Sequence, residues 1–126
     1  MTLICDAGAL VALERDDRAM WRRLKAELLQ GTPPVTHGGV VAQMWRGGYG
    51  RQAVLARALA GFDIAALDGP LGRSAGRLLG RSGSSDAIDG AVVALAADGD
   101  RIVTSDLADI QQLVDAAGRR VDVVAV

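Results

Sequence analysis

Short apolar runs alternate with longer segments of helical character along the whole chain. The short runs cover residues 2–5, 35–36, 63–67, 101–104 and 121–126, and each has the length of a buried strand. Between them, helix-compatible sequence covers residues 7–14, 17–30, 39–46, 51–59, 71–79, 86–97 and 107–117. Strands that alternate with helices indicate a parallel sheet, because a crossover helix must return the chain to the start of the next strand. We therefore predict a three-layer α/β fold in one domain over residues 1–126, with a parallel sheet of about five strands flanked by helices on both faces.

Cap and turn residues set the expected helix boundaries. Asp16 or Asp17 is expected to cap the second helix, which runs to about Gln30, and Ser85 is expected to cap the helix over 86–97. Residues 80–84 are rich in glycine and serine, which predicts a loop between the last two helical segments before the fourth strand.

Composition indicates which residue types build the core and in which cellular compartment the protein is expected. Half of the residues are hydrophobic but only 3 % are aromatic, so the core must be aliphatic. The single cysteine, Cys5, lies in an apolar run and is expected to be an unreactive core residue, as in a reducing cytoplasm. No signal peptide and no apolar run of membrane-spanning length is present, so we expect a cytoplasmic protein without a membrane partner.

Charge is unevenly distributed although the net charge is only −1. Residues 37–84 hold six arginines and two aspartates, a net charge of +4. Residues 85–126 hold three arginines and eight aspartates, a net charge of −5. This division indicates either a basic surface beside an acidic one or a chance scatter over a solvated surface.

Four aspartates stand where a parallel sheet collects side chains. Asp6 ends the first strand, Asp106 follows the fourth, and Asp86 and Asp89 occupy the first turn of a predicted helix. Sites of parallel α/β sheets form at the carboxyl ends of the strands, so we expect all four to meet at one edge. Two carboxylates about 5 Å apart repel by on the order of 3 kcal/mol, and a hard divalent cation such as Mg²⁺ or Mn²⁺ removes that repulsion. The alternative for Asp86 and Asp106 is a purely structural role as helix caps.

Three segments resemble the PIN-domain toxins of the VapC type. They are "LICDAGALVALE" with Asp6, "SDAIDGAVVALAA" with Asp86 and Asp89, and "IVTSDLADI" with Asp106. The resemblance implies that Asp6, Asp89 and Asp106 are metal ligands in a catalytic set that also includes Asp86. It also implies that Thr104 or Ser105 is an auxiliary residue.

One position departs from the family pattern. The family usually has a glutamate in the helix after the second strand, where "VVAQMWRGG" places Gln43. A neutral amide can bind a metal-bound water but contributes no charge, so weaker metal binding is expected.

The resemblance also implies a function and partners. It implies a metal-dependent endoribonuclease, a hydrolase of phosphodiester bonds, that cleaves structured RNA such as tRNA. It further implies a homodimer that is inhibited by a small antitoxin. The competing hypothesis is a catalytically weak PIN-fold module that binds RNA or protein, which the neutral Gln43 favours.

Other residues allow more than one role. Arg73, Arg77 and Arg81 recur every four residues and could bind RNA phosphates or an acidic antitoxin segment, or form a solvated face. His37, the only histidine, is expected at the surface or as a cap, and the two tryptophans are expected in core or dimer packing rather than in base stacking. A receiver domain is excluded because it needs a late lysine, and an Asp-x-Asp phosphohydrolase is excluded because position 8 is glycine.

Overall fold

Five parallel strands form one sheet, as the alternating pattern predicted. The computed structural model describes all residues from 1 to 126. In chain order the strands are β1 (Leu3–Cys5), β2 (Val35–His37), β3 (Asp63–Ala65), β4 (Arg101–Thr104) and β5 (Asp122–Ala125). Their order across the sheet is β3-β2-β1-β4-β5, and every neighbouring pair is parallel.

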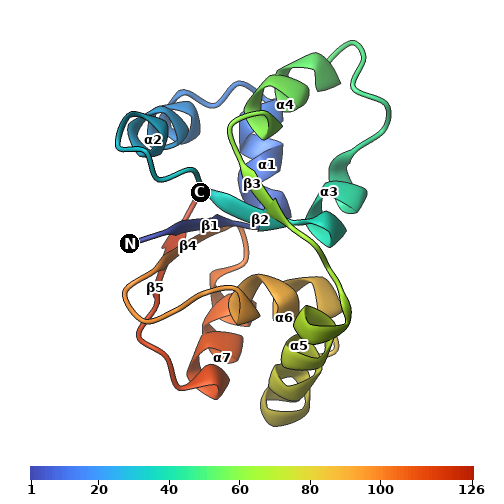
Figure 1. The fold of residues 1–126 in the computed structure, drawn as a ribbon, viewed down its shortest axis with the longest axis vertical. Coiled ribbons are helices and arrows are strands. Elements are labelled where there is room, and N and C mark those ends of the chain that lie inside the picture. The colour runs from blue at the N-terminus through green and yellow to red at the C-terminus, as the bar shows by residue number, and fades with distance from the viewer.

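Seven helices cover the two faces of this sheet and form the two outer layers of the fold (Figure 1). On one face lie α1 (Ala7–Glu14), α2 (Arg18–Leu29), α3 (Gly38–Met44) and α4 (Gln52–Leu59). On the other face lie α5 (Gly69–Ser82), α6 (Ala87–Ala94) and α7 (Leu107–Ala117). None of these helices has both the length and the apolar character that crossing a membrane requires.

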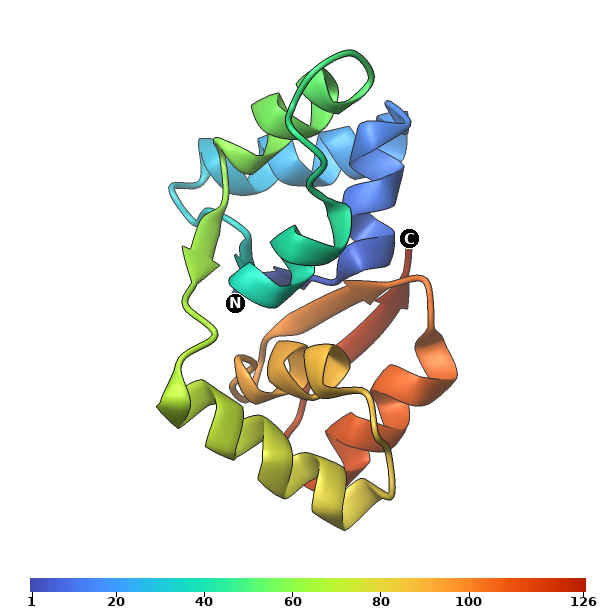
Figure 2. The ribbon, with the colours of Figure 1, turned by 90° about the vertical axis from the view of Figure 1, so that its right-hand side faces the viewer.

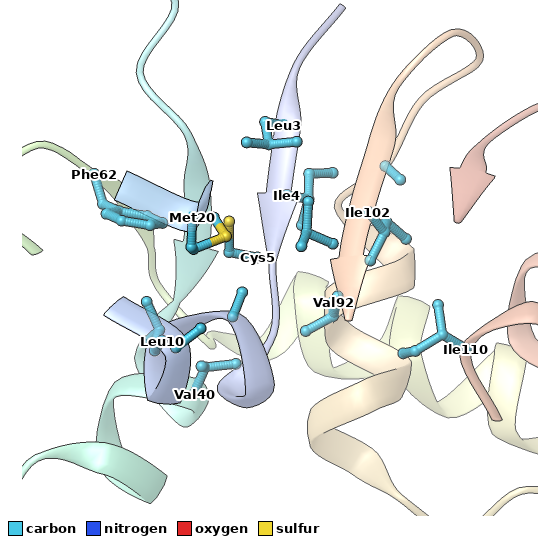
Figure 3. Packing of buried hydrophobic residues seen from close by; sticks show 14 of the residues in the cluster. Leu3, Ile4, Cys5, Leu10, Met20, Val40, Phe62, Val92, Ile102 and Ile110 are labelled. Atoms are coloured by element: carbon cyan, nitrogen blue, oxygen red, sulfur yellow. The ribbon is translucent and has the colours of Figure 1, made fainter. Parts of the chain in front are cut away.

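The core is aliphatic, as the low aromatic content predicted, and it lies on both faces of the central strands. Ile4 of β1 is aligned with Ile102 of β4, and both are fully buried. Leu10 packs on one side of these strands and Val92 on the other (Figure 3). Burying a side chain of this size stabilises the fold by about 1.5–3 kcal/mol, so the two strands that precede Asp6 and Asp106 are anchored in the core.

The predicted bounds of two helices were wrong at both ends. The helix expected over 71–79 is α5, which begins after Asp68, whose side chain accepts a hydrogen bond from the Leu71 amide. It continues through most of the expected loop to Ser82 and ends at Gly83, which has a φ of 75°. Ser85 is not a cap: Asp86 caps the next helix, α6, which therefore starts one residue later than expected and ends at Ala94.

His37 is completely buried and not at the surface, although the expected capping role is confirmed. Its Nδ1 accepts a hydrogen bond from the Gly39 amide, so its Nε2 carries the proton and donates to the carbonyl of Ile88, each at 3.0 Å. Burial lowers the pKa of His37, which keeps the ring neutral. His37 thus joins the end of β2 to the first turn of α6, across the sheet.

Candidate active site

The strand order changes direction at β1, which places a crevice at its carboxyl end. From β1 the chain proceeds outward to β2 and β3, and it then returns to β4 on the other side of β1. In open parallel sheets, the point where the strand order reverses is where sites form. Asp6 directly follows β1 and Asp106 follows β4 by two residues, so both lie at this point. Figure 2 looks onto this side of the molecule, where α3 and α6 are in front.

Asp6 is held rigidly in a nearly buried position, with a relative exposure of 5 %. Its Oδ1 accepts a hydrogen bond of 3.1 Å from the Ala9 amide at the start of α1, and its Oδ2 accepts one from the Thr104 hydroxyl. Burial raises the pKa of Asp6, the hydrogen bonds from Thr104 and Ala9 oppose that change, and the charge of Asp106 adds to it. The carboxylate is therefore fixed by two donors but still under electrostatic strain from its neighbour.

Thr104 connects the two strand-end aspartates. Its fully buried hydroxyl donates to Asp6 and also accepts a hydrogen bond of 2.8 Å from the Asp106 amide. Asp106 occupies the cap position of α7, yet its side chain makes no capping hydrogen bond. The carboxylate of Asp106 therefore does not cap α7, which removes the alternative of a capping role for its side chain.

Asp89 lies in the first turn of α6 and is half-buried. Burial raises its pKa to about 6, and the negative charges of Asp86, Asp6, Asp106 and Asp109 add to the effect. Three elements distant in sequence thus bring their carboxylates close enough to disturb one another. Asp86 differs from the others, because its Oδ1 accepts a hydrogen bond of 3.0 Å from the Asp89 amide and so caps α6.

Asp109 is a member of this cluster that the sequence analysis missed. It lies in the first turn of α7, three residues after Asp106. Hydrogen bonding with the Asp106 carboxyl raises the pKa of Asp109, and the charges of Asp106 and Asp86 act in the same direction. The spacing that singled out Asp86 and Asp89 recurs in Asp106 and Asp109, and it was the available signal.

The cluster has the donor chemistry of a hard cation site but is not arranged as one. All of the side-chain atoms that could bind a metal here are oxygens, which suits Mg²⁺ or Mn²⁺. No three of the acidic, histidine or cysteine side chains lie where one ion could contact them all. The carboxylates share an edge and repel one another, with no cationic side chain paired to any of them. The side chains would have to move for three of these carboxylates to chelate one cation.

The other expected site residues are at or near the surface. Gln43 is exposed on α3 and its side chain makes no hydrogen bond, and no acidic residue occurs in that helix. Ser105 is exposed in the turn between β4 and α7, against Gly8. The three arginines on α5 are all exposed and unpaired with any carboxylate, namely Arg73, Arg77 and Arg81.

The two tryptophans differ in their surroundings. Trp21 is half-buried, and its indole nitrogen donates a hydrogen bond of 3.1 Å to the Leu13 carbonyl. Trp45 is 39 % exposed beside an apolar hollow of about 370 Å³, whose other lining residues are Val41, Ala56, Leu59 and Ala60. Trp21 thus packs partly against the core with a fixed orientation, and Trp45 also leaves part of its ring available at the surface.

The arrangement of strands and helices is a PIN-like α/β fold, as the sequence resemblance predicted. The chain is similar to a chain of VapBC2 from Rickettsia felis, in a crystal structure of that complex bound to a DNA fragment from their promoter. The TM-score is 0.72 over 98 % of each chain, at 14 % sequence identity, which is evidence for a shared fold. No protein-family model matches the sequence, and no curated protein matches it either.

Proposed function

We propose that this protein is a metal-dependent endoribonuclease, the toxin of a toxin–antitoxin pair, which cleaves structured RNA such as tRNA. The observation that carries the proposal is the meeting of Asp6, Asp89 and Asp106 at the point where the strand order of the sheet reverses. A cluster of carboxylates destabilises the fold through the repulsion between its members, and a bound cation removes that repulsion. The similarity in fold to a chain of VapBC2 supports the same conclusion.

Asp6, Asp89 and Asp106 would hold Mg²⁺ or Mn²⁺, with Thr104 positioning two of the three. When bound, such an ion supplies an activated water and stabilises the charge that develops on a phosphodiester. Thr104 keeps one Asp6 oxygen in place through its hydroxyl. Asp86 starts α6 and holds the Asp89 backbone, so its contribution is to position Asp89. Asp109 adds negative charge beside Asp106 and is included in the proposed site.

We further propose an antitoxin as partner and a homodimer as the assembly. The VapBC2 neighbour is part of a complex, which supports a protein partner. The apolar hollow beside Trp45 and the exposed leucines 28 and 29 of α2 leave apolar surface that an assembly would cover. Light scattering at micromolar concentration that shows only monomers would contradict the homodimer.

RNA cleavage by the purified protein, with and without added Mn²⁺, tests the proposed function. We expect cleavage only with metal, and Asp6→Asn is expected to abolish it while circular dichroism shows an intact fold. Asp63→Asn, at an exposed position on the edge strand β3, is the matched control and should cleave at the wild-type rate. Binding of RNA without any cleavage at all would instead support the catalytically weak module, which the exposed Gln43 and the absence of a chelating arrangement favour.

A further inference from the structure

A hollow on the helical face away from α5, α6 and α7 is lined by six residues, four of which are cationic. It has a volume of about 510 Å³ and lies between α2 and α4. Arg18, Arg22 and Lys25 stand on one stripe of α2, because residues four and seven apart return to the same face of a helix. Arg57, from the last turn of α4, completes the cationic lining. All four side chains are exposed and so remain accessible.

The four cations of this hollow have no partners within the protein. The only ion pair in the structure joins Arg101 to Asp122, on β4 and β5. Asp16 is the one acidic residue in the lining and makes no ion pair, so the hollow carries a formal charge of +3. Like charges gathered without counterions repel one another, and an anion that enters the hollow relieves that repulsion.

The remaining lining residue is aromatic. Trp21 forms part of the wall, and the hydrogen bond from its indole nitrogen to the Leu13 carbonyl fixes its orientation. An aromatic ring beside arginine and lysine side chains fits a nucleotide, which offers a phosphate to the cations and a base or sugar to the ring. An acidic peptide would match both features only if an apolar or aromatic side chain accompanied its carboxylates, whereas every nucleotide combines the two.

The position of the carboxylates explains why such a hollow is needed. Five aspartates crowd the proposed catalytic edge, and they repel any polyanion that approaches it. The net charge of the chain is −1, so no overall attraction compensates for that repulsion. The affinity for a nucleic acid must therefore come from a local cationic surface elsewhere on the molecule.

We propose that the hollow between α2 and α4 binds the backbone phosphates of RNA and anchors the substrate away from the carboxylate cluster. This inference rests on the proposed function, since it assigns the substrate of that function a second binding surface. Arg22 and Arg57 approach the ligand from two different helices, and both contribute phosphate contacts. Trp21 contributes the aromatic wall.

The salt dependence of RNA binding tests this proposal. Fluorescence anisotropy with a labelled single-stranded RNA, in EDTA and without added metal, gives the binding constant at several salt concentrations. Each phosphate contact that is lost should reduce the slope of log K against log salt by about 0.7. Arg22→Ala should therefore reduce the slope by about 0.7, and the double variant Arg22→Ala/Arg57→Ala by about 1.4. For the double variant this difference corresponds to about 25-fold weaker binding near 0.1 M salt.

Two further variants separate charge from fold. Arg22→Lys keeps the charge and should keep the wild-type slope. Arg120→Ala removes another exposed arginine whose guanidinium makes no hydrogen bond, in the turn before β5, and should leave binding unchanged. A double variant that binds RNA with the wild-type slope and affinity would overturn the proposal. Binding of poly-glutamate, but not of RNA, that depends on Arg22 and Arg57 would also overturn it and would assign the hollow to an acidic protein segment.

The metal-free binding assay is independent of catalysis. If wild-type protein fails to cleave RNA with Mn²⁺ but its RNA binding depends on Arg22 and Arg57, the anchoring surface is supported and the proposed nuclease function is not. If cleavage occurs and RNA binding is the same in the double variant, the nuclease function is supported and the anchoring surface is rejected.

Discussion

Replacing Asp89 with asparagine should make the metal-free protein more stable at neutral pH. Burial and four neighbouring carboxylates raise the pKa of Asp89 from 3.8 to about 6, which means that its ionised form is disfavoured in the folded state. Asparagine has almost the same shape and cannot ionise. The backbone amide of residue 89, which donates to Asp86, is unaffected by the change.

The sign and the size of the effect follow from proton linkage. The unfolded chain releases the proton of Asp89 near pH 4, whereas the folded protein keeps it until about pH 6. Between these values the folded state binds more protons, so stability falls as the pH rises and stays lowered above about pH 6. A shift of about two units corresponds to about 3 kcal/mol without solvent screening. Because the side chain is about half exposed, screening reduces the expected penalty to about 1–2 kcal/mol.

Urea denaturation at two pH values measures this difference. Near pH 7.5 the free energy of unfolding of Asp89→Asn should exceed that of the wild type by about 1–2 kcal/mol, and near pH 4 the two should agree. Asp63→Asn, which removes an exposed carboxylate from β3, should show no such difference between the two pH values. Equal stability of wild type and Asp89→Asn near pH 7.5, or a difference that persists near pH 4, would refute the carboxylate repulsion.

Three other changes test the construction of the site. Thr104→Val should lower the free energy of unfolding by about 1–3 kcal/mol, because the Asp106 amide and the buried Asp6 carboxylate lose the hydroxyl that both contact. Thr104→Ser retains that hydroxyl and should keep most of the wild-type free energy of unfolding. Gly8→Ala should cost about 1–3 kcal/mol, since the added methyl group overlaps the Ser105 hydroxyl and stands 2.9 Å from the Ser105 nitrogen, and Ser105→Gly should restore part of the loss. Gln43→Glu should leave the fold intact, because Gln43 is exposed, and calorimetry should show Mg²⁺ binding about tenfold tighter; unchanged binding would place position 43 outside the metal site.

The strand ends were predictable because their signals are local. Asp6 follows a run of three buried residues, and Asp106 follows four residues of which three are buried. A carboxylate in such a place is costly unless it has a partner, and parallel pairing brings neighbouring strand ends together. The fold class and the positions of Asp6 and Asp106 therefore follow from patterns within short stretches of sequence.

The errors arose where several local signals competed. Gly80 and the serines beside it predicted a loop, yet α5 continues through Gly80 because its buried face, with Ala75 and Leu78, stays packed against α6. Propensity is a weak influence compared with packing of this kind. Ser85 and Asp86 are both good caps, and the sequence did not reveal which one the fold would use. The cationic hollow could not be predicted from local sequence patterns, because it combines residues of α2 with Arg57 of α4, which only the tertiary fold brings together.

Neutral contacts hold the acidic edge together in the absence of any counter-charge. The Thr104 hydroxyl joins the ends of β1 and β4, and the missing side chain of Gly8 lets the turn at Ser105 approach α1 closely. On the other side, the buried and neutral His37 links β2 to α6 through the Ile88 carbonyl, one residue before Asp89. These contacts carry no charge, so the hydrogen bond from Thr104 stabilises the Asp6 carboxylate only in part and no contact neutralises its charge. Hydrogen bonds and close packing therefore hold the elements of this edge in place, while the repulsion between its carboxylates remains. Binding of a divalent ion would remove that repulsion, so the ion would stabilise the folded protein.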